Sequence, residues 1–291
     1  MRIIPCTMAA FLFSAAAPAL AVNNSLDGGT GLVVMRTADT LPRGRLALST
    51  FAWGRAVRDT GDNLDWDALV MPQLSYGLFS FLEVGLGAPY MTNIDSSASG
   101  LPRVNGDIKL RFFDPAGAGI TAAVTAYGGF LPSKHTDVAS GDNNYGAELN
   151  ISMPRLLKPL GIFHASLGVE KSDTKVATGI YRREIKKRLN LGVEVPLGQK
   201  WNASMELMLA RAENVDDTAT LVPGLRYTPS DRLTWLLAAS WGTPKGIARP
   251  EVRVLGGVNY TFGGGTAAAA GPKSSPPVPG NGDAAAPSNT Q

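Results

Sequence analysis

The sequence predicts an all-β fold, an antiparallel transmembrane β-barrel of about twelve strands, with about ten or fourteen as the alternatives. From residue 43 to residue 262, apolar residues alternate with small or polar ones in segments of about ten residues, the pattern of membrane-spanning strands. Short turns with Pro or Gly alternate with longer polar connections. After the N-terminal segment, no apolar run is long enough for a transmembrane helix.

The N-terminus has the features of a secretory signal peptide. Arg2 supplies a positive start, Ile3–Ala17 is almost unbroken apolar sequence, and Ala19-Leu20-Ala21 fits the small-x-small cleavage pattern. A membrane anchor is the weaker alternative, because the stretch is short and polar residues follow it. Cys6, the only cysteine, lies in this segment, so the exported chain is expected to fold without disulfides.

Four regions are expected: a signal peptide (1–21), an N-terminal periplasmic segment (22–42), the transmembrane barrel (43–262) and a disordered periplasmic tail (263–291). The tail is rich in Gly, Ala, Pro and Ser and cannot bury a core. In barrels of this kind short turns face the periplasm and long loops face outward, which places both termini in the periplasm, below the cell outer membrane.

The candidate strands follow one another with a consistent alternation. In one of them Leu82, Val84 and Leu86 face one way, whereas Glu83 and Gly85 face the other. The last strand ends on an aromatic residue, as in an assembly signal for barrel insertion. In order, the candidates cover 43–54, 64–76, 82–90, 107–112, 120–130, 144–153, 163–170, 188–195, 201–209, 218–228, 233–240 and 251–262. A soluble β-barrel or sandwich is the alternative, and it would need fewer strands per core.

The face opposite the apolar one is predicted to line the lumen and carries charges of both signs. Such charges must be paired or hydrated. They are compatible with a salt-bridged interior that fills the barrel and with an ion-lined pore. The candidates are Glu83, Asp107, Lys109, Arg111, Glu148, His164, Ser166, Glu170, Arg188, Glu194, Glu206, Arg226 and Arg253.

Three groups of residues are considered for a function other than lining the lumen. His164-Ala165-Ser166 is similar to the His-x-Ser pair of an outer-membrane phospholipase, but nothing completes a triad, so no catalytic residue and no enzyme are predicted and a lipid hydrolase stays a remote alternative. Asp59, Asp62, Asp65 and Asp67 do not have EF-hand spacing, so no metal and no cofactor are expected. The basic run 182–188 suits lipopolysaccharide phosphates or a solvated strand extension.

Three stretches carry a resemblance to known families. Residues 31–45 resemble the approach to the first strand in barrels of the outer-membrane protein A type. Residues 76–85 and 106–111 are similar to a group of Gram-negative outer-membrane transport barrels linked to aromatic degradation pathways. No peptidoglycan-binding domain of the outer-membrane protein A type is expected after the barrel.

The resemblance implies a passive channel or transporter for small solutes, and a non-conducting structural or surface-interaction barrel is the alternative. The expected partners are outer-membrane lipid, lipopolysaccharide and the barrel assembly machinery. No nucleic acid is expected, because the net charge of +3 is spread along the chain. The oligomeric state is left open.

Overall fold

A computed structural model describes residues 24–58, 64–93, 99–100, 103–115, 119–130, 143–157, 160–175, 181–212, 215–244 and 251–263. The expected signal peptide and almost all of the expected tail lie outside these residues, as do Asp59 and Asp62 of the acidic group. No helix in the described part of the chain is long and apolar enough to span a membrane.

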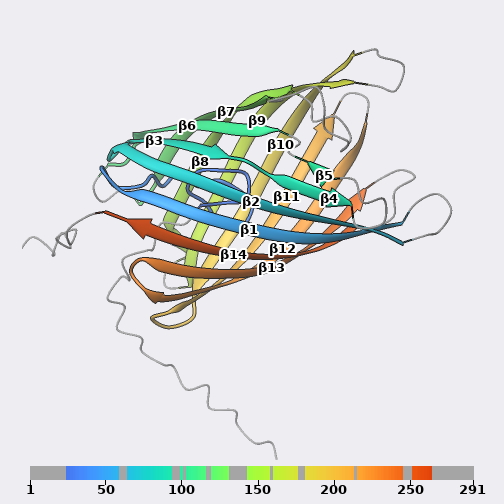
Figure 1. Cartoon of the computed structure of the whole chain (residues 1–291). Helices are drawn as coiled ribbons and strands as arrows, with labels where there is room; N and C mark the ends of the chain where they lie inside the picture. Colours follow the sequence, from blue (N-terminus) through green and yellow to red (C-terminus); the bar gives the residue numbers. More distant parts are fainter. Residues whose placement is uncertain are drawn as a thin grey trace, which may run out of the picture.

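The strands form one closed antiparallel sheet (Figure 1). Each wall strand pairs with its neighbours in sequence, and β1 pairs with both β2 and β14, which closes the barrel and leaves no free edge there. The strands are β1 (Leu46–Arg58), β2 (Leu64–Phe79), β3 (Leu82–Gly87), β4 (Tyr90–Asn93), β5 (Ser99–Gly100), β6 (Val104–Phe113), β7 (Thr121–Phe130), β8 (Asn143–Leu157), β9 (Gly161–Lys175), β10 (Tyr181–Pro196), β11 (Trp201–Ala212), β12 (Val215–Ser230), β13 (Leu233–Pro244) and β14 (Glu251–Phe262).

The barrel wall has twelve strands, as predicted. Although the sheet contains fourteen strands, β3 and β4 continue one another: Gln73 faces Gly87 and Val70 faces Tyr90 in a single register along β2. Pro89 interrupts this wall strand, because proline has no N–H to donate to the sheet. The two-residue β5 pairs only with β4 and adds no wall strand.

The two faces of the wall have opposite chemistry. On β3, Glu83 is fully buried inside, whereas Leu86 is 57% exposed on the outside. The same contrast separates buried Lys109 from exposed Ile108 on β6. Many large apolar side chains therefore cover the outer surface, while the inner surface holds most of the polar and charged groups. The predicted alternation is confirmed at these positions.

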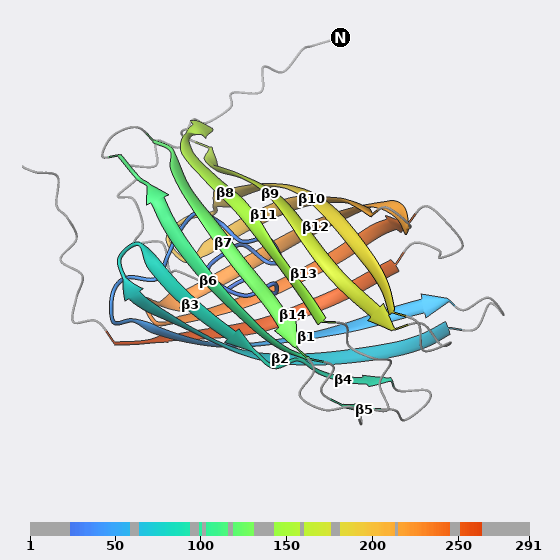
Figure 2. The same cartoon turned by 90° about the horizontal axis from the view of Figure 1, so that it is seen from above.

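The sequence predicts an N-terminal periplasmic segment over residues 22–42, ahead of the first strand. Residues 24–42, which we call the plug, fold back inside the barrel, as the blue loops in Figures 1 and 2 show. Val33, Ala38 and Leu41 are fully buried there. This placement inside the barrel was not predicted, and it has a physical reason: the plug supplies partners for inner-wall charges that would otherwise be unpaired in a narrow lumen.

The chain enters the barrel wall at the rim that carries the short turns, which we call the short-turn rim. Leu46, near the start of β1, pairs with Phe262 at the end of β14, so the barrel begins and ends at one rim. Short connections such as 80–81, 197–200 and 231–232 join strands at this rim. The opposite rim, where β1 ends at Arg58 and β2 begins at Leu64, we call the far rim.

Candidate functional site

The plug has its own compact backbone structure. Ser25 N–H donates to the Gly29 carbonyl at 2.8 Å, and Leu26 N–H donates to the Val33 carbonyl at 2.7 Å. Gly28 has a φ of 94°, which glycine adopts without the steric cost of a side chain. A Cβ on Gly31 would lie 2.3 Å from the Met35 carbonyl oxygen, so this position needs glycine for the backbone to pass so closely.

Glu206 on β11 binds three consecutive backbone N–H groups of the plug. Its carboxylate accepts hydrogen bonds from the N–H groups of Val33 at 2.7 Å, Val34 at 3.1 Å and Met35 at 2.8 Å. The side chain is fully buried. Successive N–H groups that converge on one carboxylate form an anion-binding concavity, and such charge-assisted bonds are stronger than neutral ones. Glu206, which was predicted to line the lumen, therefore binds the plug.

Glu83 and Lys109 hold the plug from the opposite side. Glu83 accepts from Thr30 N–H at 2.7 Å, from the Thr30 hydroxyl at 2.5 Å and from Leu41 N–H at 2.7 Å. Lys109 Nζ donates to the carbonyls of Thr30 at 2.5 Å and Asp39 at 3.1 Å. Since Glu83 and Lys109 face each other across β3 and β6, one cross-strand pair binds several plug groups.

Arg36 of the plug forms an ion pair with the barrel wall. Its guanidinium lies 3.1 Å from Glu148 and stacks over the Tyr127 ring at 4.4 Å. It also donates to the carbonyls of Gly28 and Asp27 within the plug. Burial alone would lower the pKa of Arg36, but the nearby carboxylates, Glu148 foremost, outweigh it and raise the pKa above its usual value. Arg36 therefore stays charged and paired.

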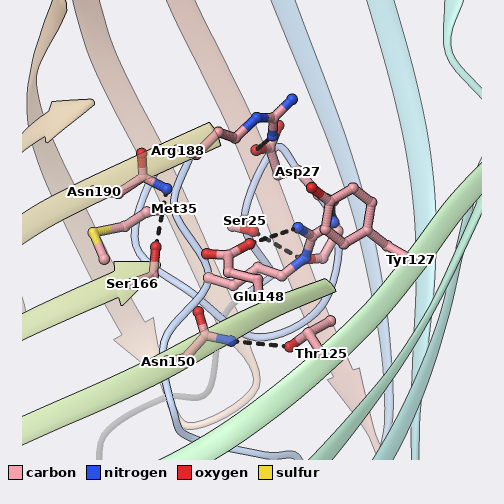
Figure 3. A network of polar contacts seen from close by, with 12 residues as sticks. Ser25, Asp27, Met35, Thr125, Tyr127, Glu148, Asn150, Ser166, Arg188 and Asn190 are labelled. Carbon is pink, nitrogen blue, oxygen red and sulfur yellow. Dashed lines mark hydrogen bonds and ion pairs between the residues drawn. The ribbon is translucent and has the colours of Figure 1, made fainter. Parts of the chain in front are cut away.

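The end of the plug nearest the far rim is held by an ion pair instead. Arg188 on β10 lies 3.4 Å from Asp27 of the plug (Figure 3). It also lies 2.5 Å from Glu170 on β9. The side chains of Arg188 and Asp27 keep 18% and 32% of their exposure. Water therefore reaches this contact, unlike the Glu206 and Glu83 contacts.

His164 and Ser166 do not form the pair that their spacing suggested. His164 Nδ1 lies 2.9 Å from the Ser152 hydroxyl, which also accepts from Ala38 N–H of the plug at 3.1 Å. Ser166 instead accepts from the Asn190 amide at 3.0 Å. With no hydrogen bond from His164 to Ser166 among the described contacts, the geometry of an activated nucleophile is missing.

The remaining predicted lining residues divide between paired interior positions and the rims. Arg226 lies 3.1 Å from Glu194, and both are buried. Asp107 is buried beside Gly28 and Gly29 of the plug. Arg111 sits at the short-turn rim, where it bonds the Ser80 carbonyl at 2.6 Å, and the guanidinium of Arg253 lies 5.2 Å from the centre of the Trp53 ring.

Between the plug and the far rim the lumen holds two cavities that share Leu26, Asp27, Arg188 and Arg253. The first, about 310 Å³, lies along β10 to β14, and we call it the cationic chamber because its described charged lining residues are Lys186, Arg188, Arg253 and one carboxylate, Asp27. The second, about 370 Å³, we call the mixed chamber. Its charged lining residues are Arg36, Arg103, Arg188, Arg253, Asp27, Asp107 and Glu170.

The plug was not predicted from the sequence, and neither were its hydrogen bonds and ion pairs with the lining charges. The available signal was the concentration of turn-forming glycines in residues 28–31, ahead of a barrel whose inner face holds several acids. The basic run was treated as a unit, but β10 divides it: Lys186 and Arg188 face the lumen, whereas Lys187 faces outward.

No protein-family model and no curated protein matches the chain. An outer-membrane channel from Pseudomonas putida F1 is similar over 79% of this chain and 100% of its own, at a TM-score of 0.62 and 12% identity. The NanC porin is similar over 73% of this chain and 98% of its own, at a TM-score of 0.56 and 12% identity. The CymD monoaromatic hydrocarbon channel reaches a TM-score of only 0.44, at 10% identity over 77% and 89% of the two chains, too low to support an argument.

These likenesses bear on the fold. They agree with the sequence resemblance to outer-membrane transport barrels, and they give no support to the resemblance to outer-membrane protein A. The chain thus has the closed β-barrel fold that is also found in outer-membrane channels.

Proposed function

We propose that the protein is an outer-membrane channel for small solutes, and that residues 24–42 must move for the lumen to conduct. The observation that carries the proposal is the combination of a polar lumen, two cavities at the far-rim side, and a plug that contacts the wall on several sides. The apolar outer face suits lipid, and lipopolysaccharide and the assembly machinery are the partners that such a location implies. The resemblance to transport barrels adds small apolar or aromatic solutes as candidate cargo.

The plug is the barrier in this proposal. Gln73 on β2, Glu83 on β3, Lys109 on β6, Glu148 on β8 and Glu206 on β11 all bond it, so its contacts are distributed around the barrel circumference. Leu32, Val33 and Met35 are at most 1% exposed, so the plug packs against the wall where they lie. Because the contacts are mostly polar, water can replace them when the plug leaves.

Deletion of residues 24–42 tests the proposal. In planar bilayers the deletion variant is expected to show large, stable single-channel steps, whereas the full chain shows small or infrequent ones. Heat-modifiable migration on gels checks that both barrels are folded. If the folded deletion variant conducts no more than protein-free lipid, the channel proposal fails.

A non-conducting structural barrel is the second candidate. The buried anchors favour it, since Glu206 and Glu83 have no water access and together accept six hydrogen bonds shorter than 3.2 Å from the plug. In that case the full chain remains closed under every voltage and solute, even though the deletion variant conducts. The two candidates therefore differ in the full chain, and the deletion variant serves as the control for an open lumen.

Location and orientation have a separate test. A protease-sensitive tag after residue 263 is expected to survive proteolysis of intact cells and to be cut after the outer membrane is permeabilised. Cleavage in intact cells would reverse the proposed orientation of the termini.

A further inference from the structure

The cationic chamber has the features of a ligand site that the channel proposal does not assign. Its volume of about 310 Å³ lies at the lower end of the range of small-molecule pockets. Plug and wall build it together: Leu26, Asp27 and Val34 come from the plug, whereas Lys186 and Arg188 come from β10. A molecule bound there would contact the barrier and the wall at once.

The charges of this chamber favour an anion. Among the described lining residues three are cationic and one, Asp27, is a carboxylate. Asp27 already lies 3.4 Å from Arg188, which also binds Glu170 at 2.5 Å. Within the described part of the chain Lys186 makes no ion pair, so its ammonium group is available to a bound anion. The mixed chamber lacks this bias, since three carboxylates line it beside four arginines.

The other lining groups favour a ligand with an apolar body. Leu26 and Val34 of the plug line the chamber together with Met208, Val222 and Leu255 of the wall. Val222 and Leu255 belong to the buried apolar cluster of the lumen, with Leu26 and Val34 packed against it. Thr218 and Ser240 add hydroxyl groups. A small inorganic anion would leave the partly buried Leu26, Val34 and Met208 uncovered, whereas an amphipathic anion contacts both the charged and the apolar residues of the lining.

We propose that the cationic chamber binds a small amphipathic carboxylate, with its charged group at Lys186 and its apolar body against Leu26, Val34 and Met208. The assignment names the cargo class of the proposed channel and so rests on that function for its biological meaning. The binding itself does not depend on conduction. A carboxylate of this kind meets a primary amine that can donate up to three hydrogen bonds.

Isothermal titration of the purified full-length barrel in detergent tests the assignment with three probes. Benzoate has both features, benzyl alcohol has the ring without the charge, and acetate has the charge without the ring. Benzoate is expected to bind at least about tenfold more tightly than either of the others, since each lacks one of the two recognised features. Equal affinity of benzoate and benzyl alcohol, or of benzoate and acetate, would overturn the assignment.

A matched pair of variants locates the site. Lys186→Gln removes the ammonium group inside the chamber, and Lys187→Gln removes one from the opposite face of the same strand. Benzoate affinity is expected to fall about tenfold in the first variant and to stay unchanged in the second, because only Lys186 can donate a charge-assisted hydrogen bond to the ligand. Equal loss in both, or in neither, contradicts the site.

The two proposals fail in different ways. If benzoate binds through Lys186 but the deletion of residues 24–42 produces no conductance, the channel proposal is wrong and the binding site stands. If the deletion variant conducts but benzoate binds no better than its uncharged or ring-free analogues, only the carboxylate assignment is wrong.

Discussion

The two ends of the plug are attached in different ways. Near the barrel middle and the short-turn rim, Glu206 and Glu83 accept hydrogen bonds from backbone N–H groups and are fully excluded from water. Toward the far rim, Asp27 meets Arg188 at 3.4 Å with both side chains partly exposed. Buried charge-assisted bonds leave costly unpaired groups when they break, whereas an exposed ion pair exchanges readily with water and salt.

This difference indicates how the plug would move. The Asp27 end is expected to detach first, at low cost, and to widen the route between the two chambers. The Glu206 and Glu83 end is expected to fix the position of the plug and to set the barrier to full opening. Local openings of this kind start where contacts are few and solvent-exposed.

The largest effect is expected from Glu206→Ala. The substitution leaves three plug N–H groups without their acceptor, and the two buried ones, of Val33 and Met35, cost about 1–3 kcal/mol each if they stay unsatisfied. Single-channel recordings are expected to show a large increase in open probability. Asp217→Asn, which removes an acid that is 56% exposed on the same half of the barrel, serves as the control. An unchanged open probability in Glu206→Ala would mean that the buried end does not hold the plug.

A smaller effect, on the conformation of the plug, is expected from Gly31→Ala, which changes the plug without changing a wall residue. Its methyl group would lie 2.3 Å from the Met35 carbonyl oxygen, and backbone atoms cannot yield cheaply. Gly54→Ala is the control, because a Cβ there meets nothing within 4 Å. Protease cleavage within residues 24–42 of the folded barrel is expected to become faster only in Gly31→Ala. Equal cleavage of both variants would show that plug conformation does not depend on this close approach.

The smallest effect is expected from Asp27→Asn. A partly exposed ion pair contributes about 0–1 kcal/mol, so open probability should rise by less than about fivefold. The rise should shrink at high salt, because screening weakens the same pair in the parent protein. Recordings at low and high salt check both points. If Asp27→Asn opened the channel as much as Glu206→Ala, the two ends of the plug would not differ.

The barrel was predictable from sequence because alternation is a local signal. Leu82 to Gly87 and the residues of β14 show it directly, and closure follows from the number of such strands. The break at Ala88–Pro89 was not predicted, although the continuous register along β2 keeps it within one wall strand. The plug was missed because its contacts are not local: Val33 bonds Glu206, which lies 173 residues away in sequence.

The site was predictable only in part for the same reason. The alternation identified which charges face inward, such as Glu83, Glu148 and Glu206, but not which groups they bind. The partners of Glu83 and Glu206 are mostly backbone N–H groups, which every residue except proline carries, so no side-chain pattern identifies them. The His164 and Ser166 spacing showed the reverse error, since two residues on one strand face took different partners.

A reversible tether between plug and wall tests most directly whether plug movement opens the barrel. A Cβ on Gly224 would lie 2.5 Å from Val33 Cγ2, which occupies the place that a cysteine sulfur would take, so Val33→Cys with Gly224→Cys suits a disulfide. Cys6 is the only native cysteine, and Cys6→Ser provides the background. Single-channel conductance of this variant is expected to be absent when oxidised and to return on reduction to the level of the background protein. Conductance that persists with the tether formed would contradict the account.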